Sequence, residues 1–77
     1  MPRLTPVHWK TLERIFLRAG FAFDRQGGDH RVYVKEGISR PVVIPTYKEV
    51  DTEIIRSNMR TAMMSRDEYF SLLDECK

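Results

Sequence analysis

The sequence predicts an α+β domain whose elements follow the order α-β-β-β-α-α. Three observations lead to this fold class. Apolar residues recur at helical spacing in residues 12–19, they alternate in residues 21–34 around a pair of glycines, and helical stripes return after residue 51. A chain of 77 residues is long enough for one small domain. We therefore expect a single domain over residues 1–77 with a modest core.

The first helix is predicted to begin at Thr5, a residue type that caps helix N-termini, with Pro6 in the first helical position. Apolar residues at i, i+3, i+4 and i+7, from Leu12 to Ala19, form its buried face. Gly20 then supplies the left-handed residue that ends many helices. This start also places His8 in the first turn, on the surface.

A hairpin follows, with a two-residue turn predicted at Gly27-Gly28. In that register Phe23 faces Val32 and Phe21 faces Val34 on the inner side, and Asp24 pairs with Arg31 outside. Arg25 lies opposite His30 at the turn end of the inner side. Residues 36–39 form a second turn and residues 41–45 a third strand. The pattern leaves open which face of the sheet Val43 takes.

Two helices complete the chain. Asp51 or Thr52 can cap the first of them, and Ser65 with Glu68 forms a capping box for the second. We expect one shared core from the agreement of these periods, with three methionines (Met59, Met63 and Met64) as filler. Its predicted members are Leu12, Ile15, Phe16, Phe21, Phe23, Val32, Val34, Ile55, Met59 and Leu73.

Composition excludes several classes of protein. Hydrophobic residues make up 42% and charged residues 31% of the chain, unlike a disordered tail or a membrane protein. Residues 1–20 carry charges throughout, so no signal peptide is expected. The single cysteine, Cys76, cannot form an internal disulfide, which favours the reducing cytoplasm.

Charge is unevenly distributed along the chain. Residues 1–48 carry nine basic and four acidic side chains, whereas residues 49–77 carry four basic and seven acidic ones. A basic first part indicates an anionic partner such as nucleic acid. A stripe of Lys10, Arg14 and Arg18 on the first helix is typical of a solvated face.

The two histidines lie in different elements, and no carboxylate–histidine spacing matches a metal-ligand set, so neither a metal nor a cofactor is expected. His30 is the candidate catalytic residue. It follows a glycine turn, next to Asp29, Arg25 and Arg31. Histidine is the side chain suited to proton transfer near neutral pH, and arginines can hold a phosphate. Cleavage of an RNA phosphodiester needs a base for the 2′-OH and cations for the transition state. Taken alone, a histidine at a strand start is more often structural than catalytic.

Residues 25–33 resemble the Arg-Gln-Lys-Gly-Ser-His-His signature of HicA-type toxins, the YcfA-like mRNA interferases. Residues 42–45 resemble the third strand of that family, residues 55–60 its Leu-Arg-Ser-Ile-Leu-Arg helix, and residues 65–73 its Ile-Ser-x-Glu-Glu-Phe tail. Three positions depart from the pattern: Gly27 replaces a lysine, Asp29 replaces a serine, and Tyr47 stands where many members have a second histidine.

The resemblance implies a fold like that of double-stranded RNA-binding domains, with a three-stranded antiparallel sheet and helices on one face. It also implies a cytoplasmic, metal-independent endoribonuclease toxin that acts on mRNA and is held inactive by a HicB-like antitoxin. His30 would be the catalytic residue and Asp29 would modulate it. The residues expected to contact RNA are Arg25, Gly28, Arg31 and Lys35.

Two alternatives stay open from the sequence. The chain could be a noncatalytic RNA-binding module of the same fold, or a degenerate family member that only binds its antitoxin. Acidic residues at 49, 51 and 53 argue against ordinary duplex binding, because double-stranded RNA-binding domains carry lysines at the corresponding helix start.

Overall fold

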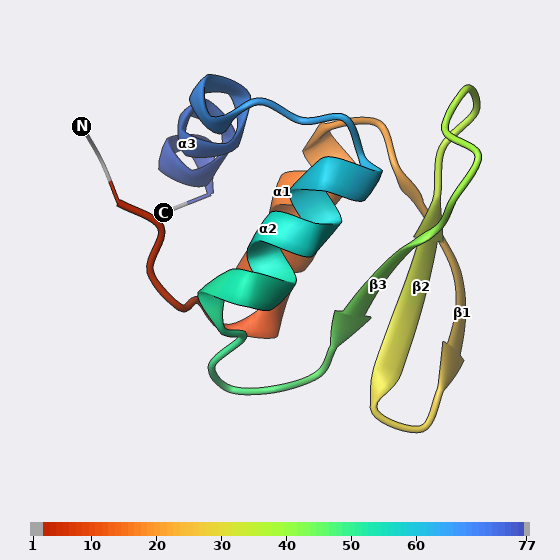
Figure 1. Cartoon of the computed structure of the whole chain (residues 1–77). Coiled ribbons are helices and arrows are strands. Elements are labelled where there is room, and N and C mark those ends of the chain that lie inside the picture. Colours follow the sequence, from red (N-terminus) through yellow and green to blue (C-terminus); the bar gives the residue numbers. More distant parts are fainter. Residues whose placement is uncertain (1–2, 77) are drawn as a thin grey trace.

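In the computed structural model, which describes residues 3–76, the elements follow the order predicted from the sequence. Their bounds are α1 Trp9–Arg18, β1 Ala22–Gly27, β2 His30–Val34, β3 Val42–Pro45, α2 Thr52–Thr61 and α3 Arg66–Glu75. The strands form one antiparallel sheet in the order β1-β2-β3. Figure 1 shows the sheet on one side of the molecule and the helices on the other, which confirms the predicted α+β layout.

The first helix starts three residues later than predicted, because its predicted N-terminal segment is used elsewhere. Val7 forms an antiparallel bridge with Val50 through two backbone hydrogen bonds of 3.3 and 2.7 Å. His8 is then the N-cap, and its Nδ1 accepts a hydrogen bond from the Lys10 backbone N–H at 3.1 Å. The assignment of Thr5 as the cap was therefore wrong. Gly20 has a φ of 102° and ends α1 as predicted.

The hairpin turn lies one residue beyond the predicted position. Gly28 and Asp29 form the turn, so Gly27 pairs with His30. Gly28 has a φ of 58°, a left-handed conformation that glycine adopts without steric cost. Since Gly27-Gly28 and Gly28-Asp29 both suit a two-residue turn, the local sequence does not distinguish them.

A β-bulge in β1 changes which residues share a face of the sheet. Phe23 pairs with Tyr33, the register shifts at Asp24, and Arg25 pairs with Val32. Phe23 and Val32 therefore lie on opposite faces, and the predicted pairing between them was wrong. The predicted pairs Asp24–Arg31 and Arg25–His30 are absent because the turn lies one residue later, which places Gln26 opposite Arg31.

Alternate residues of β2 point to opposite sides of the sheet. Tyr33 pairs with Val42 and Arg31 with Ile44, and these four side chains lie on the face that packs against α1. His30 pairs with Pro45 and Val32 with Val43 on the other face, which we call the open face. This arrangement settles the position of Val43, which the sequence left undecided. The structure thus places His30 on the open face rather than the inner one.

Sequence signals at the ends of α2 and α3 were read correctly. The Asp51 carboxylate accepts from the Ile54 N–H at 3.0 Å, and the Ser65 hydroxyl accepts from the Glu68 N–H at 3.0 Å. The predicted apolar stripe on α2 ends early, because the helix stops at Thr61. Met63 takes a left-handed φ of 55° and is 82% exposed, so it was wrongly included among the core methionines.

The core sits between α1, the inner face of the sheet, α2 and α3. Six of the ten predicted core residues belong to it as buried members, and Leu73 packs against it half-buried: the six are Leu12, Ile15, Phe16, Phe21, Ile55 and Met59. Val32 is buried but lies on the open face, while Phe23 and Val34 are exposed. The register shift replaces them with fully buried residues that were not predicted: Tyr33, Val42 and Ile44.

Candidate functional site

The backbone around His30 is held on both sides. His30 is the first residue of β2 and is exposed. Across β3, the Asp29 carbonyl accepts hydrogen bonds from the Thr46 backbone N–H at 2.7 Å and from the Thr46 hydroxyl at 3.1 Å. On the β1 side, the Gln26 side-chain amide donates to the Gly28 carbonyl at 3.2 Å. The glycine turn therefore presents the imidazole from a fixed main chain, as acid–base catalysis requires.

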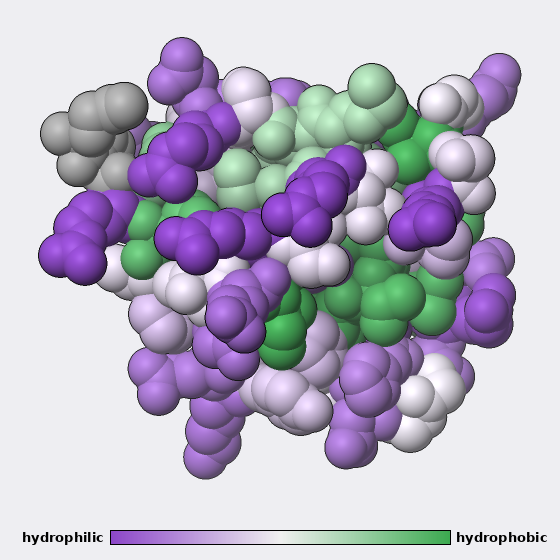
Figure 2. All heavy atoms as spheres, in the orientation of Figure 1, coloured by the Kyte–Doolittle hydropathy of each residue, from purple (hydrophilic) through white to green (hydrophobic). Residues whose placement is uncertain are grey.

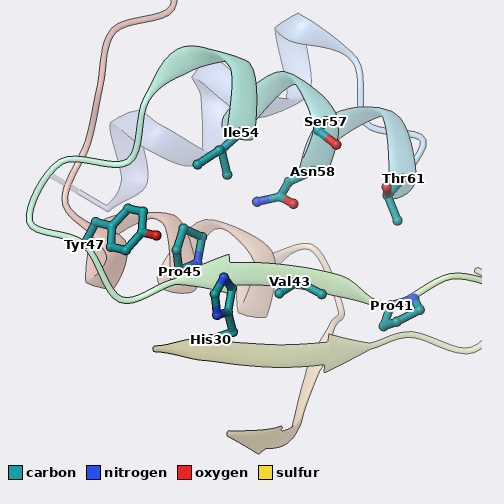
Figure 3. A pocket seen from close by; sticks show the side chains of 9 residues that line it. All are labelled: His30, Pro41, Val43, Pro45, Tyr47, Ile54, Ser57, Asn58 and Thr61. Carbon is teal, nitrogen blue, oxygen red and sulfur yellow. The ribbon is translucent and has the colours of Figure 1, made fainter. Parts of the chain in front are cut away.

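A hollow of about 310 Å³ lies beside this histidine, between β3 and α2. Its walls combine apolar side chains with polar groups from the exposed side of α2. The lining residues are His30, Pro41, Val43, Pro45, Tyr47, Ile54, Ser57, Asn58 and Thr61. Figure 3 shows the His30 ring reaching across β3 toward Pro45, with Asn58 pointing down from α2 toward the same place. We call this hollow the His30 pocket.

The surface around this pocket mixes apolar and polar side chains. Val43 and Tyr47 are both exposed apolar residues in its lining. Figure 2 shows hydrophobic side chains at the surface in the region where Figure 1 draws β3, with hydrophilic ones around them. Such a surface suits a ligand with both flat apolar parts and charged parts.

Two further hollows adjoin the pocket along α2, and Ser57 lines all three. One, of about 340 Å³, is lined by Arg40 and Arg60, and the other, of about 260 Å³, by Arg56 and Arg60. Sequence reasoning missed these arginines, because it considered only the acidic residues at the start of the helix. The helical spacing of residues 56 and 60 was the available signal.

The structure separates the two arginines that were predicted beside His30. Arg25 pairs with Val32 and therefore shares the open face with His30. Its guanidinium contacts the Asp24 carboxylate at 2.7 Å, with side chains 71% and 42% exposed. Arg31 points to the opposite face of the sheet. The expectation that Arg31 and His30 are spatial neighbours was wrong.

Arg31 is instead the centre of a half-buried network on the inner face. Its Nε and Nη2 lie 3.1 and 3.0 Å from the Glu13 carboxylate, and Nε donates to the Tyr33 hydroxyl at 3.0 Å. The Tyr33 hydroxyl itself donates to Glu13. The guanidinium also stacks on aromatic rings, 4.2 Å from the Phe23 centroid and 5.4 Å from that of Trp9.

This network shifts the pKa of two of its members. Burial, followed by the hydrogen bond to Glu13, raises the pKa of Tyr33 to about 12. The hydrogen bond to Tyr33 is the main cause that raises the pKa of Arg31. Both shifts keep the side chains in the protonated forms that the network uses at neutral pH.

Lys35 also lies on the inner side of the sheet. Its Nζ donates to the Ala19 carbonyl at 2.8 Å and lies 5.7 Å from the centroid of Phe21. A cation at this position stabilises the C-terminus of α1. The predicted RNA contacts Lys35 and Arg31 thus have structural partners, whereas Arg25 and Gly28 belong to the His30 side.

Within residues 3–76, no group of three or more histidine, cysteine, aspartate or glutamate side chains could hold a metal ion. The same part of the chain contains no helix that is long and apolar enough to cross a membrane.

Comparison with known families agrees with this geometry. No curated protein matches the chain. One family model, described as the HicA toxin of bacterial toxin–antitoxin, matches residues 9–64. The match runs from α1 through α2 and includes the glycine turn, His30 and the three hollows, while the tail at residues 65–73 lies outside it. Such membership implies a toxin role and an antitoxin partner. The chain belongs to the HicA toxin family of bacterial toxin–antitoxin systems.

Proposed function

We propose that this toxin is a metal-independent endoribonuclease that cleaves mRNA with His30 as its catalytic residue. The observation that carries the proposal is the position of His30. Its imidazole is exposed on a rigid turn, at the rim of a pocket that adjoins two arginine-lined hollows. The bases of RNA are flat and suit the pocket, and its phosphates are anionic and suit the arginine-lined hollows.

In the proposed reaction His30 removes the proton from a ribose 2′-hydroxyl, and the 2′-oxygen attacks the adjacent phosphorus. The bond to the 5′-oxygen breaks, and this oxygen leaves with a proton from the imidazolium or from water. The products are a 2′,3′-cyclic phosphate and a 5′-hydroxyl. One well-placed acid–base side chain typically contributes about 10²–10⁴-fold to such a rate.

Charge stabilisation falls to arginines other than Arg31. Arg25 shares the open face with His30, and its partner Asp24 holds it only by an exposed ion pair that a phosphate can replace. Arg40, Arg56 and Arg60 lie along the adjoining hollows and would hold the RNA backbone on either side of the cut. These four residues and the turn at Gly28 form the proposed RNA surface.

The proposed partner is an acidic HicB-like antitoxin that covers His30 and the open face. A toxin of this kind must be masked during growth, and arginines on the face offer an electrostatic route to fast association. Antitoxin binding and RNA binding would then exclude each other.

The test is cleavage of single-stranded RNA by the purified protein in EDTA, comparing wild type with His30→Ala. We expect cleavage by the wild type, a loss of most activity in the variant, and resistance of RNA carrying a 2′-deoxy sugar at the cut. Because His30 is exposed, His30→Ala should keep the wild-type melting temperature. Equal cleavage by both proteins would exclude His30, and cleavage by neither would favour a noncatalytic RNA-binding module or a protein that only binds antitoxin.

The same assay assigns the role of Asp29, which directly precedes His30 in the sequence. If this charge repels the phosphate, Asp29→Ser speeds cleavage; if it orients the imidazole, the substitution slows it. The main-chain contact from Asp29 to Thr46 uses the carbonyl, so the turn itself should survive the change.

A further inference from the structure

Asn58 carries a buried side-chain nitrogen that the described residues leave unpaired. It lies in the middle of α2 and is only 6% exposed. Within residues 3–76 its side-chain nitrogen makes no hydrogen bond. An amide left in this state destabilises the folded protein, and buried polar groups in native proteins are nearly always paired. This nitrogen is itself enclosed, but Asn58 lines the His30 pocket, so a turn of its side chain would present the nitrogen to a partner from outside the chain.

The direction of this side chain supports that explanation. Ile55 and Met59, its neighbours on α2, are buried in the core, whereas Asn58 lines the His30 pocket. Figure 3 shows the amide projecting from the helix into the space between α2 and β3. Opposite it are the apolar side chains of Val43 and Pro45.

The pocket favours a nucleobase over a phosphate. Its lining contains no arginine or lysine, and Val43, Pro45 and Ile54 make much of it apolar, while arginines line the adjoining hollows instead. A base has flat faces that can stack on Tyr47, and edge atoms that accept hydrogen bonds from an amide. The volume of about 310 Å³ leaves room for one such ring system.

We infer that the His30 pocket takes one unpaired base of the RNA, and that the Asn58 side chain turns so that its amide donates a hydrogen bond to an acceptor atom on the edge of the base. This inference rests on the proposed function for the identity of the ligand. Asn58 is then a specificity-determining residue: it selects the base next to the phosphate that the 2′-oxygen attacks. The toxin would cut preferentially beside one or two of the four bases.

Binding can be measured apart from cleavage with 2′-O-methyl pentanucleotides, in which the attacking hydroxyl is blocked. Four oligonucleotides that differ only in their central base are titrated into ¹⁵N-labelled protein. The side-chain amide signals of Asn58 should shift, and the affinities for the four should differ. Asn58→Leu should lower the affinity for the preferred oligonucleotide by about tenfold, which corresponds to one lost hydrogen bond. The four affinities should then be similar. Ser71→Ala, an exposed change on α3, is the control and should alter nothing.

The stability of the same variant separates binding from a structural role. Leucine has nearly the shape of asparagine and no unpaired polar group, so Asn58→Leu should raise the melting temperature while weakening binding. A lower melting temperature would mean that the amide serves the fold. If the leucine variant does not fold, Asn58→Asp keeps the size and removes the donor, and should likewise lose the preference.

The outcomes distinguish this inference from the proposed function. Base-selective binding through Asn58 without RNA cleavage would support the pocket and overturn the nuclease. Cleavage whose base preference is unchanged in Asn58→Leu would support the nuclease and overturn the pocket. Amide signals that stay unmoved with all four oligonucleotides would also overturn it.

Discussion

Replacing Arg31 tests the division of the sheet into a structural face and a functional face. Arg31→Ala removes the ion pair to Glu13, the hydrogen bonds to Tyr33 and Gln26, and the stacking on Phe23. Breaking a buried ion pair costs about 3–5 kcal/mol. The two side chains here are 22% and 20% exposed, and Glu13 keeps the Tyr33 hydroxyl as a donor, so the low end of that range applies.

We therefore expect Arg31→Ala to lower the free energy of unfolding by about 3 kcal/mol. A chain of this length is stable by about 4–12 kcal/mol, so the variant should still fold in most of that range. The corresponding fall in melting temperature is about 12–24 °C. Urea unfolding followed by circular dichroism measures the loss. The fluorescence of Trp9, the only tryptophan and a direct neighbour of Arg31, gives a second signal.

The matched control is Arg25→Ala, on the opposite face of the sheet. Its ion pair is exposed, so the free energy of unfolding should change by about 0–1 kcal/mol, while the affinity for single-stranded RNA should fall. The reasoning would be refuted if Arg31→Ala left stability unchanged and weakened RNA binding more than Arg25→Ala does. A double-mutant cycle with Glu13→Gln should give a coupling energy of about 1 kcal/mol or more.

Two further predictions concern alkaline stability and the antitoxin. Burial raises the pKa of Tyr69 to about 12, and its hydroxyl has no hydrogen-bond partner within residues 3–76. Because the folded protein favours the neutral phenols of Tyr69 and Tyr33, stability should hold up to about pH 10 and fall between pH 10 and 12. In pH-dependent urea unfolding, Tyr69→Phe should reduce this fall and add about 1 kcal/mol at pH 7. Arg25→Glu should slow association with an acidic antitoxin and weaken its salt dependence in stopped-flow measurements; equal rates at all salt concentrations would exclude this face as the docking surface.

Local signals were sufficient for the elements of the fold. Asp51, Ser65 and Gly20 mark helix ends through hydrogen bonds or a backbone angle that involve only neighbouring residues. The start of α1 was not predictable in this way, because Val7 is held by Val50, more than forty residues away. Because this bridge forms between distant parts of the folded chain, a cap motif read from the local sequence does not reveal it.

The candidate site shows the same difference between local signals and long-range contacts. His30 could be identified from the sequence, because a glycine turn and the family resemblance both mark it. Asn58 and the arginines of α2 could not, since their importance depends on the hollow that forms when α2 lies against β3. In the sequence Asn58 is simply a polar helix residue that lies between the apolar stripe positions Ile55 and Met59.

The bulge at Asp24 explains why Phe23 lies on the inner face with Arg31 while Arg25 lies on the open face. In a regular strand, side chains two residues apart share a face, so Phe23 and Arg25 would both point inward or both outward. The extra residue lets Phe23 pack under the Arg31 guanidinium while Arg25 turns to the face of His30. One inserted residue thus lets neighbouring positions of β1 serve both the Arg31 network and the proposed RNA surface. An alternating pattern cannot reveal the inner position of Arg31, because its partner Glu13 lies in another element.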